Sequence, residues 1–158
     1  MWWAKVLLCI SFSAIAYQDL KYKSVSLYWF ILVGLALGLL HYHFVVFEQF
    51  LTNVAFNLVF VTILVLIIYT YIKLRGINQF SKAIGSGDIL MFFVLSLSFS
   101  TLSFMFCFIF SLFFSLILSL YLNRKDKNQI PLAGYMSIFF GLIFIAYWLG
   151  FIRQLYSI

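Results

Sequence analysis

The sequence predicts an all-α, polytopic integral membrane protein with about six transmembrane helices, forming a single domain over residues 1–158. Hydrophobic residues make up 66% of the chain and charged residues 9%, and the mean hydropathy is +1.13. A soluble domain carries about 25% charged residues, so this inventory cannot build a water-facing surface. A membrane helix needs about 20 apolar residues, so the length allows about six spans with short loops and no separate soluble domain.

Three apolar runs occupy the first half of the chain, at residues 2–18, 25–40 and 50–72. Within the first run, Ala14-Ile15-Ala16 resembles a signal-peptide cleavage site. Charged residues and a second apolar run follow it directly, so we expect a retained helix. His41 and His43 lie between the second and third runs. They are two residues apart and would not share a helix face, so we interpret them as interfacial residues rather than a metal site.

The second half begins after a polar segment, Lys73–Asp88. The next 34 residues, 89–122, are apolar and exceed one span, so a turn must interrupt them. A cluster of hydroxyl residues predicts where this turn falls, between a short fourth helix and a longer fifth helix. The cluster consists of Ser96, Ser98, Ser100, Thr101 and Ser103. A last apolar run, 130–151, begins with Ile130-Pro131, and proline is tolerated at a helix start.

The basic residues alternate between loops. Eight lie in the first, third and fifth loops, and the second and fourth loops have none. The eight are Lys21, Lys23, Lys73, Arg75, Lys82, Arg124, Lys125 and Lys127. Under the positive-inside rule, the odd loops lie in the cytoplasm and both termini lie outside. The net charge of +6 therefore reflects membrane orientation, and we expect no nucleic-acid partner.

The cysteine pattern predicts neither a disulfide nor a metal centre. Cys9 and Cys107 both lie within apolar runs, as buried and inert thiols do. No CxxC pair occurs in the chain, so a zinc-binding module is excluded on ligand count. We expect no metal and no cofactor.

Two aspartates lie at the same predicted membrane border. Asp19 ends the first helix and Asp88 begins the fourth, just after Gly85 and Gly87. An ionisable group at the mouth of a membrane segment suggests a functional site. Structural interpretations remain open: Asp88 could cap its helix, and Asp19 could be a surface charge paired with a neighbouring lysine.

The other two acids fit such a site less well. Glu48 falls on the opposite side of the membrane, and Asp126 lies among basic residues, where a solvated ion pair is expected. If Asp19 and Asp88 meet in a poorly solvated site, one would keep a proton while the other acts as a base. Such a pair can activate water against a peptide carbonyl.

Three stretches resemble the type IV prepilin peptidases, the GxGD membrane aspartyl proteases. The first is Asp19-Leu20-Lys21-Tyr22-Lys23-Ser24-Val25-Ser26, which matches the motif of one catalytic aspartate. The second is Gly85-Ser86-Gly87-Asp88, which matches the GxGD motif. The third is Ile130-Pro131-Leu132-Ala133-Gly134, which partly follows a helix start near the family's C-terminus.

The resemblance covers essentially the whole chain and implies Asp19 and Asp88 as the catalytic pair, with Gly85 and Gly87 in the substrate-binding loop. It implies a multi-pass protein of the inner (cytoplasmic) membrane that removes the leader peptide of prepilin or pilin-like precursors. The chain has neither the length nor the cysteines of the larger, methylating members, so it resembles the minimal, peptidase-only form.

Two departures from the family pattern keep other functions open. Leu90 stands where the family commonly has lysine, and Ser26-Leu27 where it commonly has Pro-Asn. A non-cleaving, pilin-binding member is one alternative. A small transporter or scaffold that uses Asp19 and Asp88 as a proton or cation site is the other. The sequence leaves the oligomeric state open.

Overall fold

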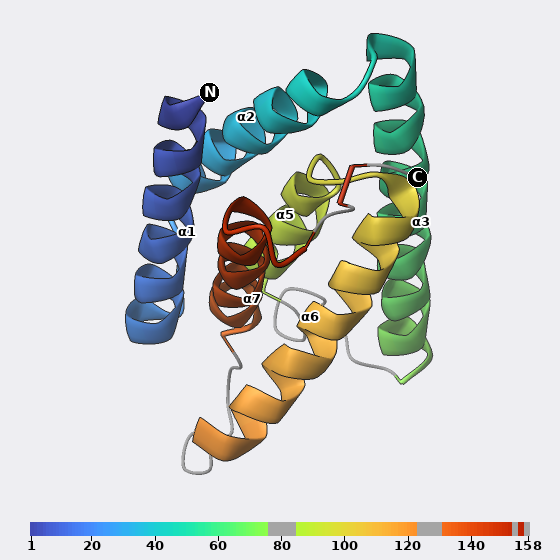
Figure 1. Cartoon of the computed structure of the whole chain (residues 1–158). Helices are drawn as coiled ribbons and strands as arrows, with labels where there is room; N and C mark the ends of the chain where they lie inside the picture. Colours follow the sequence, from blue (N-terminus) through green and yellow to red (C-terminus); the bar gives the residue numbers. More distant parts are fainter. Residues whose placement is uncertain (76–84, 123–130, 153–154, 157–158) are drawn as a thin grey trace.

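The structure is a computed structural model that describes residues 1–75, 85–122, 131–152 and 155–156. Its regular elements are all helical, which confirms the all-α prediction for this part of the chain. The helices are α1 (Trp2–Tyr22), α2 (Leu27–Phe44), α3 (Phe47–Leu74), α5 (Ser86–Leu95), α6 (Thr101–Leu122) and α7 (Leu132–Trp148) (Figure 1). The predicted ion pair at Asp126 and most of the two longest basic loops lie outside the described residues.

Three of the six helices, α2, α3 and α6, are long and apolar enough to cross a membrane. α5 has 10 residues, which span about 15 Å at 1.5 Å per residue. The hydrocarbon layer is about 30 Å thick, so α5 cannot cross it alone. The predicted short fourth helix is therefore present, but it ends inside the bundle.

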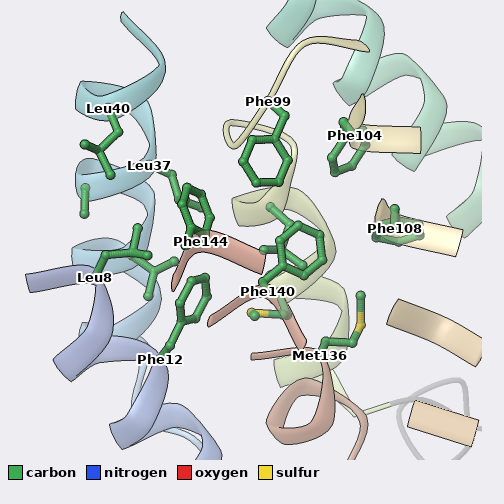
Figure 2. Close-up of a cluster of buried hydrophobic side chains, with 14 of the residues drawn as sticks. Leu8, Phe12, Leu37, Leu40, Phe99, Phe104, Phe108, Met136, Phe140 and Phe144 are labelled. Atoms are coloured by element: carbon green, nitrogen blue, oxygen red, sulfur yellow. The ribbon is translucent and has the colours of Figure 1, made fainter. Parts of the chain in front are cut away.

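α7 lies in the middle of the bundle, between α1 and α6 (Figure 1). It packs against α1, α6 and α5, and most of its first half is buried. Aromatic side chains fill the space around it, as Figure 2 shows for Phe12, Phe99, Phe140 and Phe144. Because lipid is as apolar as these rings, close van der Waals packing holds the helices together. The beginning of α7 is thus fixed relative to its neighbours.

α1 belongs to the same core. Ala4, Leu8, Phe12 and Ile15, which recur every three or four residues, are buried on one face of it. The helix extends to Tyr22, beyond the predicted end of the apolar run, and Asp19 consequently lies in its last turn.

The predicted turn at the hydroxyl cluster is confirmed, because α5 ends at Leu95 and α6 begins at Thr101. Irregular backbone at membrane depth needs hydrogen-bond partners from the protein. Asn57 Nδ2 supplies two of them, donating to Ser96 O at 2.9 Å and Phe99 O at 3.0 Å. His41 Nδ1 donates to Leu97 O at 3.1 Å. His41 is fully buried in the protein, whereas His43 is exposed.

Candidate active site

The first turn of α7 holds the two aspartates. The first amides of any α-helix have no partner within the helix, and Pro131, the residue that precedes α7, provides no side-chain cap. Ala133 N donates to Asp88 Oδ1 at 2.8 Å, and Gly134 N donates to Asp19 Oδ2 at 2.6 Å. Two carboxyl groups from different helices thus bind successive amides of a third helix.

Asp19 is stabilised by α7 rather than by its own helix. A carboxylate in the last turn of α1 faces the negative end of that helix dipole, which is unfavourable. The side chain is only 7% exposed, and its partner Gly134 lies at the positive end of α7. Lys21 donates instead to the Tyr17 hydroxyl at 2.7 Å, on the exposed surface. The interpretation of Asp19 as an exposed charge paired with lysine is therefore wrong.

Asp88 occupies the first turn of α5, and Gly85 rather than Asp88 is the N-cap residue. Asp88 also receives a backbone hydrogen bond from Gly85. A residue three positions after the N-cap that reaches back to the cap amide is the second half of a capping box. The cap interpretation is thus partly right, but the same carboxyl group also binds α7, which local capping does not require.

The two carboxyl groups lie outside the three helices that can cross a membrane. Burial raises the pKa of Asp19, and the hydrogen bond from Gly134 opposes this effect. Burial likewise raises the pKa of Asp88 from 3.8 to about 6, and the nearby charge of Asp19 adds to the increase. The hydrogen bonds from Ala133 and Gly85 lower the pKa of Asp88 but do not offset the burial. A pair in this situation retains a proton more readily than two separate surface carboxylates.

The asymmetry between the two carboxyl groups has a chemical consequence. Asp19 is buried, whereas Asp88 is only half-buried and therefore accessible to another molecule. Each carboxyl group accepts the hydrogen bond from α7 with one oxygen, Oδ1 of Asp88 and Oδ2 of Asp19. The other oxygen of each group takes no part in that bond. The arrangement can hold one proton and one negative charge on two neighbouring carboxyl groups, as acid–base chemistry on a bound substrate requires.

Three glycines line this region in different ways. A Cβ on Gly134 would lie 3.1 Å from Asp19 Cβ and 3.2 Å from Asp19 Oδ2. A Cβ on Gly85 would lie 3.0 Å from Asp88 Oδ2. In contrast, a Cβ on Gly87 would point toward Phe30 of α2, whose Cζ would be 3.7 Å away. Of the two glycines predicted at the site, Gly85 therefore lies against the carboxyl group and Gly87 faces α2.

The amides of Ala133 and Gly134 are the site groups that residue-by-residue reasoning did not single out. The available signal was Pro131, because proline is typical of a helix start and the first amides of any helix have no partner within it. Glu48 does not join the site, since it lies exposed in the first turn of α3. Within the described ranges, no group of three or more His, Cys, Asp or Glu side chains could hold a metal ion.

Comparison of the chain with protein-family models, curated proteins and solved structures gives no match.

Proposed function

We propose that this chain is a membrane aspartic endopeptidase that removes the leader peptide of prepilin or pilin-like precursors at the cytoplasmic face. The proposal is supported above all by the bonding of Asp19 and Asp88 to successive amides of α7. Aspartyl proteolysis requires two neighbouring carboxyl groups of which one keeps a proton, and the raised pKa values of Asp19 and Asp88 fit this requirement. The motif resemblance and the predicted cytoplasmic side of both aspartates supply the substrate class and the compartment.

In the proposed reaction, one carboxylate takes a proton from water while the water oxygen bonds to the scissile carbonyl carbon. The protonated partner donates its proton to the carbonyl oxygen, which gives a tetrahedral intermediate. The intermediate then collapses and the C–N bond breaks. The leaving amine takes the proton first removed from water, and one hydroxyl proton of the intermediate returns to the other aspartate as the carbonyl group re-forms. The pKa of Asp88, which burial raises to about 6, suits Asp88 to carry the proton of the pair.

The substrate bond must reach this pair in an extended form. A helix keeps its carbonyl groups in internal hydrogen bonds, so a bond within the substrate's own membrane helix is protected. The bond just before that helix is not. The pair lies where α1 ends and where α5 and α7 begin, so we infer that the enzyme cuts at the cytoplasmic junction of its substrate.

A proton or cation site in a small transporter or scaffold is the main alternative. The α7 amides point N–H donors at both carboxyl groups, and a cation would have to compete with them. This feature favours an acid pair over a cation site. A non-cleaving pilin-binding protein would keep the same geometry, so only an activity assay separates it from a peptidase.

The test is incubation of the detergent-solubilised protein with pilin precursors, followed by mass analysis of the new N-terminus. A single cut just before the apolar helix is the expected result, and Glu48→Gln should cut equally well because Glu48 lies outside the site. If no precursor is cut but the protein retains bound precursor, the non-cleaving function replaces the proposal. If no precursor is cut and Asp88→Asn changes proton flux in liposomes, the transporter function replaces it.

A further inference from the structure

α1 and α5 carry the two aspartates, and α7 is the element that bonds to both. α7 packs extensively on α1 and less extensively on α5. Its Ala133 and Gly134 amides are adjacent in one rigid helical turn, so they fix the position of one carboxyl group relative to the other. The register between α1 and α7 consequently determines whether the pair is assembled.

Gly134 is a point of close approach between α7 and α1. Apolar carbon atoms in contact normally lie about 3.5–4.0 Å apart, whereas a Cβ on Gly134 would lie only 3.1 Å from Asp19 Cβ. Asp19 Cβ is bonded directly to the α1 backbone and cannot rotate away. Relief would require a shift of α1 against α7, and this shift would lengthen the bond from the Gly134 amide to Asp19.

We propose that Gly134 is a positioning residue of the catalytic pair: its missing side chain lets α7 approach α1 closely enough for its first-turn amides to hold both carboxyl groups. This inference rests on the proposed peptidase function for its catalytic consequence, but the assembly of the pair can be tested without any substrate. Gly134 itself takes no part in bond breaking. It acts through the position of Asp19.

A matched pair of glycine variants tests the catalytic consequence. Gly134→Ala should lower the cleavage rate by up to about 100-fold, the loss that a misplacement of about 1 Å can cause. Gly141→Ala adds the same methyl group to the same helix, where nothing lies within 4 Å, and should cleave like the wild type. Equal cleavage by folded Gly134→Ala and wild-type protein would overturn the inference.

A second measurement needs neither activity nor a substitution at Gly134. The chain has eight glycines, so ¹⁵N-glycine labelling gives a simple amide spectrum in detergent. The Gly134 signal should shift as the pair takes up its proton between about pH 8 and about pH 4. Asp19→Asn should reduce this shift, because the Gly134 amide then binds an uncharged oxygen and only Asp88, on the neighbouring amide, still titrates. The Gly141 signal should not move. If the chemical shift of the Gly134 amide does not change with pH, the inference is contradicted. If the shift changes with pH but the protein cuts no precursor, only the peptidase function is refuted.

Discussion

Replacement of Asp88 by asparagine should stabilise the protein at neutral pH. Asparagine keeps a carbonyl oxygen that can accept from the Ala133 amide, but it carries no charge. In the wild type, burial raises the pKa of Asp88 from 3.8 to about 6. Each pKa unit corresponds to about 1.4 kcal/mol, so ionisation of Asp88 costs the folded state up to about 3 kcal/mol.

The sign of the effect fixes its pH dependence. Below about pH 3.8, Asp88 is protonated in the folded and unfolded chain alike, and its ionisation costs nothing. Between about pH 3.8 and about pH 6 the unfolded chain ionises first, so the wild type loses stability as the pH rises. Above about pH 6 the full cost remains. Asp88→Asn removes this cost, so its advantage over the wild type should be larger at about pH 8 than at about pH 4.

Thermal unfolding in detergent, followed by circular dichroism at these two pH values, measures the difference. Solvent reaches the half-buried side chain, so we expect a gain of about 1–3 kcal/mol in the free energy of unfolding, or an increase in Tm of about 2–12 °C at the higher pH for a chain of this size. Glu48→Gln, which removes an exposed carboxylate, should show little pH-dependent gain. A lower Tm for Asp88→Asn at about pH 8 would refute the reasoning, because Asp88 would then act as a stabilising, ionised helix cap.

Three further results are expected. Gly85→Ala should impair cleavage, since its methyl group would meet the Asp88 carboxyl group at 3.0 Å, whereas Gly87→Ala has 3.7 Å to its nearest neighbour and should be tolerated in the same assay. Equal loss in both variants would give Gly87 a role in substrate contact that the resting geometry does not require. Asn57→Leu should lower the free energy of unfolding by about 1–3 kcal/mol in denaturant titrations, because two buried carbonyl groups lose their donor; an unchanged value would mean that the turn does not depend on Asn57. Reporter fusions after Gln49 and after Asn128 should report opposite sides of the membrane, the second being cytoplasmic. A cytoplasmic signal from the fusion after Gln49 would reverse the proposed orientation and move the aspartates to the other face.

Features that depend on local sequence were predictable. A run of 34 apolar residues is too long for one span, and its hydroxyl cluster located the turn that the structure has between Leu95 and Thr101. The alternation of basic loops placed Asp19 and Asp88 at one end of the bundle, and both aspartates do bind the same end of α7. Neither result required knowledge of which helices pack together.

Features that depend on tertiary packing were not predictable in the same way. The environment of Asp19 is set by the Gly134 amide, more than 100 residues away in sequence. The sequence around Asp19 indicates only the unfavourable dipole of its own helix and the neighbouring lysines. The hydrogen bond of His41 was not predictable for the same reason, because its partner, the Leu97 carbonyl, belongs to the turn after α5. The different surroundings of Gly85 and Gly87 likewise follow from helix packing, although the two residues share one motif.

The most direct test of a catalytic aspartate pair is the cleavage of a pilin precursor by Asp19→Asn and Asp88→Asn, each compared with the wild type by mass analysis of the product. Both variants keep an acceptor for their α7 amide and should remain folded and inserted. Each removes one of the two groups that exchange the proton, so each should abolish the new N-terminus. Substantial cleavage by either folded single variant would contradict the aspartyl mechanism.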